Sequence, residues 1–164
     1  MPNFNIKSYL KLIFLISFIS IISAYFIEYI LGFQPCNLCL IQRIPYALSI
    51  ILLISNSIFN KNEKFFIILL ILIFIFSFAI SFYHFGIEQG FFEESAVCLS
   101  KSDSNIISKE ELLKQLSQKN ISCKDVTFKI FGMSLTTFNM ILSLIILIIL
   151  TNIFKNYEKY KKQS

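Results

Sequence analysis

The sequence has little charge and lacks several familiar functional motifs. Only 15% of its 164 residues are charged, whereas a typical soluble domain has about a quarter. Tryptophan is absent, and the chain has a single histidine. There is no phosphate-binding loop, dinucleotide fingerprint or Ser/His/Asp arrangement, and nothing indicates haem or flavin. These absences argue against a soluble domain and against nucleotide-dependent or serine-hydrolase chemistry.

Apolar residues instead come in blocks long enough to cross a bilayer. They make up 55% of the chain, and about 20 of them in a row suffice for one span. The first block follows two lysines as in a signal peptide, but it is too long and no cleavage pattern follows it, so we expect an uncleaved anchor. The sequence predicts an all-α integral membrane protein, a four-transmembrane-helix bundle that forms a single domain over residues 1–164, with spans at about 12–33, 40–59, 65–85 and 130–154.

The distribution of lysine predicts the orientation of these spans. The amino end, the turn at 60–64 and the tail after Phe154 carry eight lysines and two glutamates, whereas the rest of the chain is slightly acidic. The positive-inside rule therefore places both termini in the cytoplasm and the loops 34–39 and 86–129 on the opposite, periplasmic side. The net charge of +5 is explained by this topology and gives no reason to expect a nucleic-acid partner.

All four cysteines fall in the two outer loops, Cys36 and Cys39 in the first, Cys98 and Cys123 in the second. Disulfides persist outside the bacterial inner membrane, whereas the cytosol keeps thiols reduced, so we expect two redox pairs on the periplasmic side. The alternatives are two disulfides that only staple the loops, or a four-thiolate zinc site. A bridge that closes a loop as short as Cys36–Cys39 stabilises little, and closely spaced cysteines before a helix are typical of reactive thiols.

Arg43 follows Cys39 by four residues. If the second span is helical from Leu40, the two side chains share a face, and the arginine would favour a Cys39 thiolate and stabilise negative charge on a bound acceptor. The alternative is an arginine that reaches the lipid head groups. Pro45 disfavours a helix that starts as early as Leu40, whereas a start nearer Gln42 loosens the geometry of Cys39 and Arg43.

Other polar residues lie near the outer ends of the spans. His84 and Glu88 are four residues apart, so they could pair with each other or approach a bound cofactor. The alternative for His84 is an interfacial hydrogen bond to lipid or to the backbone. Glu28 is expected simply to reach water. Asn139 and Ser143, in the fourth span, are expected to make contacts between helices, as small polar residues commonly do.

The long loop contains the pattern of a short helix. Ser108 to Glu111 forms a capping box, flanked by Ile107 and Leu112 as a hydrophobic staple. The helix would end near Asn120. It is either a surface helix folded on the loop or, as we expect, a helix in the membrane interface that holds Cys123 close to Cys36.

Several segments resemble the bacterial disulfide bond formation protein B family, DsbB. PCNLCLIQR after the first span is similar to the family signature P-C-x-x-C-x-x-[QE]-R. SFYHFGIEQGFF at the end of the third span and SCKDVTFKIFGMSLTTFNMILSL before and within the fourth resemble the corresponding stretches of the family. The resemblance covers nearly the whole chain.

The resemblance implies a protein-dithiol:quinone oxidoreductase of the bacterial inner membrane. Such an enzyme reoxidises a periplasmic DsbA-like thiol protein and passes the electrons to ubiquinone or menaquinone. By family analogy the partner attacks Cys98, Cys123 then attacks Cys36, and Cys39 delivers the electrons to the quinone beside Arg43; His84 and Glu88 are further candidates for contact with the quinone. The alternatives are an enzyme similar to vitamin K epoxide reductase, in which the loop cysteines precede the C-x-x-C, and a non-enzymatic, disulfide-stapled membrane scaffold.

Overall fold

The computed structural model describes residues 6–59, 63–94, 98, 123–124, 129–130 and 133–157. Its elements in chain order are α1 (Ile6–Tyr29), α2 (Asn37–Phe59), α3 (Glu63–Glu88), β1 (Lys129–Ile130), β2 (Met133–Ser134) and α5 (Leu135–Lys155). Each of the four helices is long and apolar enough to cross a membrane. The predicted all-α membrane fold with four spans is therefore confirmed. The helix expected at 108–120 lies outside the described residues.

The first and fourth helices differ from the expected spans. Helix α1 begins at Ile6 and ends at Tyr29, earlier at both ends than the expected 12–33, and Gly32 then adopts a φ of 73° that suits a turn. Helix α5 begins at Leu135 rather than near 130, because β1 and β2 first pair as a small antiparallel hairpin. The expected fourth span included these two strands, since apolar content alone does not distinguish a strand from a helix.

The second helix begins earlier than either start considered from the sequence. Helix α2 starts at Asn37 and carries Pro45 in its interior, where the ring is fully buried. Membrane helices tolerate proline because neighbouring groups can satisfy the carbonyl that loses its partner. This start places Cys39 in the first turn and Arg43 one turn further along the helix.

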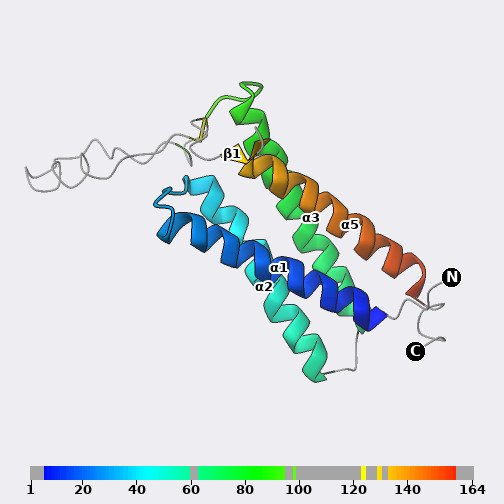
Figure 1. Ribbon diagram of the computed structural model, residues 1–164. Helices are drawn as coiled ribbons and strands as arrows, with labels where there is room; N and C mark the ends of the chain where they lie inside the picture. Colours follow the sequence, from blue (N-terminus) through cyan, green and yellow to red (C-terminus); the bar gives the residue numbers. More distant parts are fainter. Residues whose placement is uncertain are drawn as a thin grey trace, which may run out of the picture.

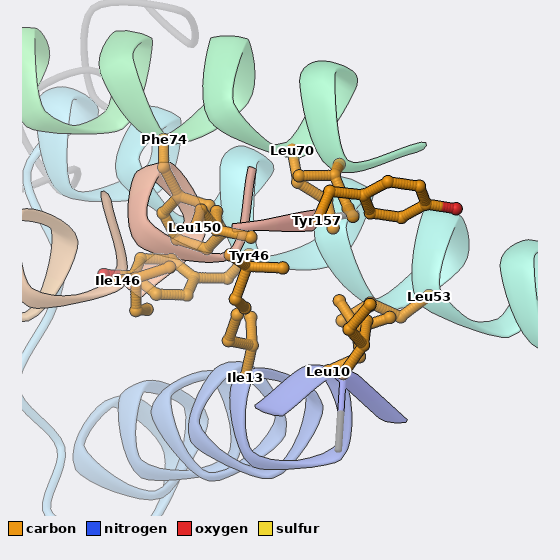
Figure 2. Packing of buried hydrophobic residues seen from close by; sticks show 12 residues of the cluster. Leu10, Ile13, Tyr46, Leu53, Leu70, Phe74, Ile146, Leu150 and Tyr157 are labelled. Carbon is orange, nitrogen blue, oxygen red and sulfur yellow. The ribbon is translucent and has the colours of Figure 1, made fainter. Parts of the chain in front are cut away.

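The four helices form one bundle (Figure 1). Helix α3 packs against both α2 and α5, and α1 packs against α2. Helix α1 begins and α5 ends at the same end of the bundle, as an even number of spans requires (Figure 1). Side chains from all four helices meet in the bundle core, where the Tyr46 and Phe74 rings pack edge to face with centroids 5.7 Å apart (Figure 2).

The outside of the bundle is apolar, whereas buried serines lie between the helices. Ile19, Ile58 and Ile148 are all more than half exposed, as suits side chains that face lipid rather than water. Between helices, Ser49 donates a hydrogen bond to Ser17 at 3.0 Å, and Ser77 and Ser143 lie 3.0 Å apart. Small polar residues allow close packing of membrane helices, and the predicted interhelical role of Ser143 is confirmed.

Candidate redox site

The first cysteine pair lies at the amino end of α2. Cys36 immediately precedes the helix and Cys39 belongs to its first turn, and both are free thiols whose Sγ atoms are only 2.6 Å apart. The Cys39 backbone N–H donates to Cys36 Sγ at 3.3 Å. The first N–H groups of a helix have no partner inside the helix and favour negative charge. The pair is thus placed to form a disulfide, and the helix end favours a thiolate at Cys36.

The sulfur of Cys36 is buried and in contact with polar groups. His84 Nε2 lies 3.6 Å from it, and both residues are almost fully shielded from solvent. The hydrogen bond from the Cys39 thiol does most to lower the pKa of Cys36, whereas burial raises this pKa. The hydrogen bond and the charge of His84 lower it further, and the pKa of Cys36 is about 5. Cys36 is therefore a thiolate at neutral pH when the pair is reduced.

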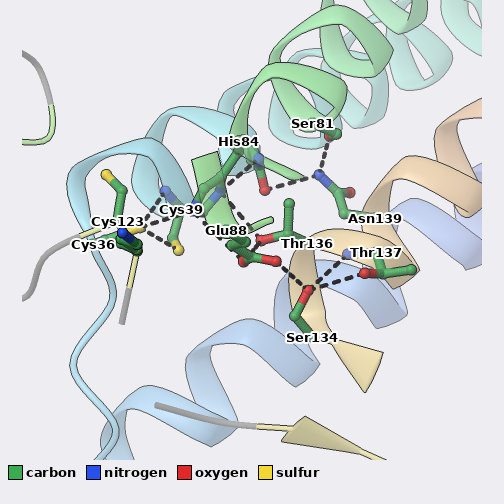
Figure 3. Close-up of polar contacts among 12 residues, drawn as sticks. Cys36, Cys39, Ser81, His84, Glu88, Cys123, Ser134, Thr136, Thr137 and Asn139 are labelled. Carbon is green, nitrogen blue, oxygen red and sulfur yellow. Dashed lines mark hydrogen bonds and ion pairs between the residues drawn. The ribbon is translucent and has the colours of Figure 1, made fainter. Parts of the chain in front are cut away.

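The second pair is a disulfide that packs against the first. Cys98 and Cys123 are joined with their Cα atoms 5.5 Å apart. They belong to one apolar cluster with Cys36, Leu38 and Ile87, and Figure 3 shows Cys123 beside Cys36. The predicted proximity of Cys123 to Cys36 is confirmed, although the helix proposed to hold it lies outside the described residues.

His84 and Glu88 pair at the end of α3, one of the arrangements expected from the sequence. His84 Nε2 lies 3.8 Å from Glu88 Oε1, and the two side chains are 2% and 5% exposed. The start of α5 supplies the partners of the carboxylate: Thr136 donates to Oε1 at 2.6 Å and Ser134 to Oε2 at 2.5 Å (Figure 3). Ser134 is also the N-cap of α5. The carboxylate is therefore held at a helix amino end, where negative charge is favoured.

Arg43 is held by α1. Its Nη1 forms an ion pair with Glu28 Oε2, and its guanidinium lies 5.0 Å from the centre of the Tyr25 ring. The two charged side chains are 17% and 21% exposed. Glu28 is thus the ion-pair partner of Arg43 and does not simply reach water, which corrects the expectation from the sequence.

A cavity connects these groups. It is bounded by α1, α2, α3 and the first turns of α5. Its volume of about 420 Å³ is within the usual range of roughly 300–1,000 Å³ for small-molecule sites. Most of the wall surface is apolar, and the sulfur-bearing and charged residues that line it are Cys36, Cys39, Cys123, Arg43, His84 and Glu88. The structure therefore brings all the candidate site residues except Cys98 to the wall of one cavity.

Three atoms of this site could also hold a metal. The sulfurs of Cys36 and Cys39 and a ring nitrogen of His84 lie within 4.8 Å of one another. Two thiolates bound to one tetrahedral zinc, at about 2.3 Å each, would be about 3.8 Å apart, whereas these sulfurs are 2.6 Å apart. The four-cysteine zinc site considered from the sequence would in addition require Cys98 and Cys123, which are joined to each other. The spacing fits disulfide chemistry better than metal binding.

Two polar residues that sequence reasoning missed also belong to the site. Gln42 Nε2 lies 3.1 Å from His84 Nδ1, and Thr136 Oγ1 lies 3.2 Å from the same nitrogen. Both are buried. A signal was present, since buried polar residues in membrane spans often mark functional sites, and Gln42 stands inside the PCNLCLIQR segment.

Comparison with known proteins agrees with this site. The family described as Disulfide bond formation protein DsbB matches residues 7–153. The uncharacterized protein RP370 of Rickettsia prowazekii (strain Madrid E) is 34% identical over 137 residues, which cover 82% of this chain and 80% of that protein. The SPbeta prophage-derived disulfide bond formation protein B of Bacillus subtilis (strain 168) is 37% identical over 84 residues, or 51% of this chain and 55% of that protein. No solved structure matches the chain. The chain belongs to the DsbB family and is a disulfide-forming membrane oxidoreductase.

Proposed function

We propose that this protein reoxidises a periplasmic DsbA-like thiol protein and passes the electrons to ubiquinone or menaquinone. It does so as a single domain in the bacterial inner membrane, with both termini cytoplasmic and all four cysteines periplasmic. One observation carries the proposal: a free cysteine pair and a disulfide pack in one cluster, beside a cavity that opens among apolar helices.

The reduction potential of the partner explains why a quinone is a suitable electron acceptor. A DsbA-like protein is a strong oxidant, with a potential of about −120 mV, so the protein that oxidises it needs a terminal acceptor of still higher potential. A membrane quinone supplies one. The low pKa of Cys36 stabilises the reduced pair as a thiolate, and stabilising the reduced form makes a disulfide easier to reduce.

The electrons move by successive thiol–disulfide exchange. The partner's thiolate attacks Cys98 Sγ and breaks the Cys98–Cys123 bond, and the Cys123 thiolate then attacks Cys36 of the oxidised first pair and releases Cys39. The partner's second thiol resolves its bond to Cys98, and Cys98 displaces Cys36 from Cys123. The reduced pair, Cys36 and Cys39, finally gives two electrons and two protons to the quinone, which becomes a quinol as their disulfide closes.

The cavity offers a place for the quinone ring. Its wall is largely apolar, as a quinone with an isoprenoid tail requires, and Cys39 and Arg43 both line it. In this proposal Cys39 delivers the electrons, and the Arg43 cation stabilises the negative charge that develops on the quinone oxygens. Glu28 and Tyr25 hold the guanidinium in position. Roles for His84 and Glu88 in contact with the quinone belong to the same proposal, since both line the cavity.

A trapped mixed disulfide tests the entry of electrons. A DsbA-like partner that lacks the second cysteine of its own C-x-x-C cannot resolve its bond, so an adduct accumulates. We expect peptide mapping to place the bond at Cys98, and we expect Cys98→Ser to abolish the adduct. A bond at Cys123 would reverse the roles of the second pair, and no adduct at all would favour the stapled scaffold.

A further inference from the structure

We propose that Asn139 and Gln42 are positioning residues that keep the proton of His84 on Nε2, the ring nitrogen that faces the Cys36 sulfur. The catalytic meaning of this inference rests on the proposed function. The position of the proton in the neutral ring does not, because it follows from a buried series of hydrogen bonds through α3, α5 and α2.

The series of hydrogen bonds starts at Ser81, whose hydroxyl hydrogen is already donated to a backbone carbonyl. The buried Ser81 hydroxyl donates to the Ser77 carbonyl oxygen at 2.8 Å, so only oxygen lone pairs face its other neighbour. Asn139 Nδ2 donates to Ser81 Oγ at 2.7 Å, and Asn139 Oδ1 accepts from the Tyr46 hydroxyl at 2.5 Å. Figure 3 shows the Asn139 side chain reaching Ser81. These contacts fix which way the Asn139 amide points.

The orientation passes from Asn139 to Gln42. Asn139 Nδ2 also donates to Gln42 Oε1 at 3.1 Å, which turns Gln42 Nε2 toward His84 Nδ1, 3.1 Å away. An amide nitrogen is only a donor, so the ring nitrogen that faces it must be free of a proton. A neutral imidazole then carries its proton on Nε2.

Thr136 is the other neighbour of Nδ1, and its contact opposes that of Gln42. Its hydroxyl lies 3.2 Å from Nδ1 and 2.6 Å from Glu88 Oε1. Because this hydroxyl donates to Glu88, its oxygen faces Nδ1 as an acceptor and by itself favours a proton there. The Gln42 amide, held by Asn139, points a donor at Nδ1 from 3.1 Å and outweighs the hydroxyl. Gln42 therefore decides the tautomer.

The selected tautomer suits the groups on the far side of the ring. Nε2 faces Cys36 Sγ at 3.6 Å and Glu88 Oε1 at 3.8 Å, and a thiolate and a carboxylate are both acceptors. In its neutral form, His84 thus donates to the Cys36 thiolate through Nε2. In the proposed exchange this stabilises Cys36 when Cys98 displaces it from Cys123 and before it closes on Cys39.

Nitrogen NMR tests the inference directly. His84 is the single histidine of the chain, so ¹⁵N-histidine labelling of the full protein in detergent gives one pair of ring nitrogens. With Cys36 and Cys39 reduced, we expect the neutral ring, observed at the high-pH end of its titration, to show Nδ1 as an unprotonated nitrogen and Nε2 as a protonated one. A neutral ring with its proton on Nδ1 would overturn the proposal.

Two variants test the relay itself. Asn139→Asp offers only acceptors, so Gln42 turns its amide nitrogen toward the aspartate and its oxygen toward the ring. We expect the proton of the neutral ring to move to Nδ1. Asn152→Asp, the same change at an exposed position of α5 whose side chain contacts Asn156, is the control and should leave the spectrum unchanged.

The milder variant Ser81→Ala removes only a hydroxyl and releases the Asn139 amide. It should give signals of both tautomers, whereas Ser55→Ala should not, although Ser55 also donates to the carbonyl four residues before it. Wild-type spectra in both Asn139→Asp and Ser81→Ala would refute the relay.

Discussion

Cys36 differs from Cys39 in the groups around its sulfur. It receives the Cys39 backbone N–H and faces His84, and it lies at the free end of a helix. These contacts explain why its pKa falls to about 5, the hydrogen bond from the Cys39 thiol contributing most and His84 less. A thiol with a lowered pKa remains a reactive thiolate above that pH and loses reactivity as the pH falls through it.

The alkylation of Cys36 should follow this pKa. In reduced protein with Cys98→Ser and Cys123→Ser, we expect iodoacetamide to modify Cys36 before Cys39, with a half-maximal rate near pH 5. His84→Ala should move the profile to higher pH, because one donor to the thiolate is lost. Mass spectrometry of quenched samples measures both rates. A profile typical of an unperturbed thiol, centred near 9.0, would contradict the account.

Arg43 and Glu28 can be separated by a double-mutant cycle. If Arg43 stabilises the reduced quinone, Arg43→Ala should lower quinone reduction about tenfold or more, equivalent to about 1.4 kcal/mol, and leave exchange with the partner protein nearly unchanged. Glu28→Gln should have a smaller effect, because the cation remains. Arg43→Lys should be intermediate, since lysine lacks the planar set of donors.

The same double-mutant cycle can also contradict a role of Arg43 in stabilising the reduced quinone. If Arg43 only neutralises Glu28, the two single variants should lose similar activity and the double variant should recover it. Apparent KM and kcat for the quinone are the quantities to compare.

At the scale of elements, the start of α5 joins the bundle to the site. Ser134 caps α5 by accepting from the Thr137 N–H at 3.2 Å, and it also donates to Glu88. We expect Ser134→Ala to lower the free energy of unfolding by about 1 kcal/mol, the usual effect of losing an N-cap. Thermal unfolding in detergent measures the change. Ser55→Ala, at a half-buried position of α2 where the hydroxyl donates to the Ile51 carbonyl, is the control, and an equal loss of stability there would show that the cap of α5 contributes nothing special.

Much of the fold could be predicted because bilayer crossing needs only length and apolar content. Each of the four apolar blocks corresponds to a helix of the structure. The ends of the helices differ from the expected ends, because length and apolar content do not determine where a helix begins or ends. Lys129–Ile130 and Met133–Ser134 look like the start of a span, yet they pair as antiparallel strands, and Pro45 lies inside a helix that begins at Asn37. Local backbone pairing and the packing of neighbouring helices decide such ends.

The candidate site could be predicted in part. Spacing along the chain was sufficient for the C-x-x-C pair and for His84 and Glu88, which share one helix face. It was not sufficient for Gln42 and Thr136, which reach His84 from α2 and α5, nor for the Arg43–Glu28 pair between α1 and α2. Contacts between helices depend on how the helices pack, and one sequence carries no spacing rule for that.

At the scale of the whole molecule, the proposed topology places the redox chemistry on one side of the membrane. Reporters fused after Lys64 or Ser164 should indicate the cytoplasm, and reporters inserted at 100–104 should indicate the periplasm. The lysine-rich segments favour this orientation. A cytoplasmic signal from the long loop would contradict the proposal, because all four cysteines would then face the reducing compartment.

The central claim is that electrons pass from a protein dithiol to a quinone through both cysteine pairs. Purified protein in detergent is mixed with a reduced DsbA-like partner and with ubiquinone or menaquinone, and quinone absorbance and partner thiols are followed together. The account predicts one quinol for each disulfide formed in the partner, and loss of this activity in Cys36→Ser and in Cys98→Ser. Partner thiols that stay reduced with both quinones, or that are oxidised equally well by the Cys36→Ser protein, would contradict it.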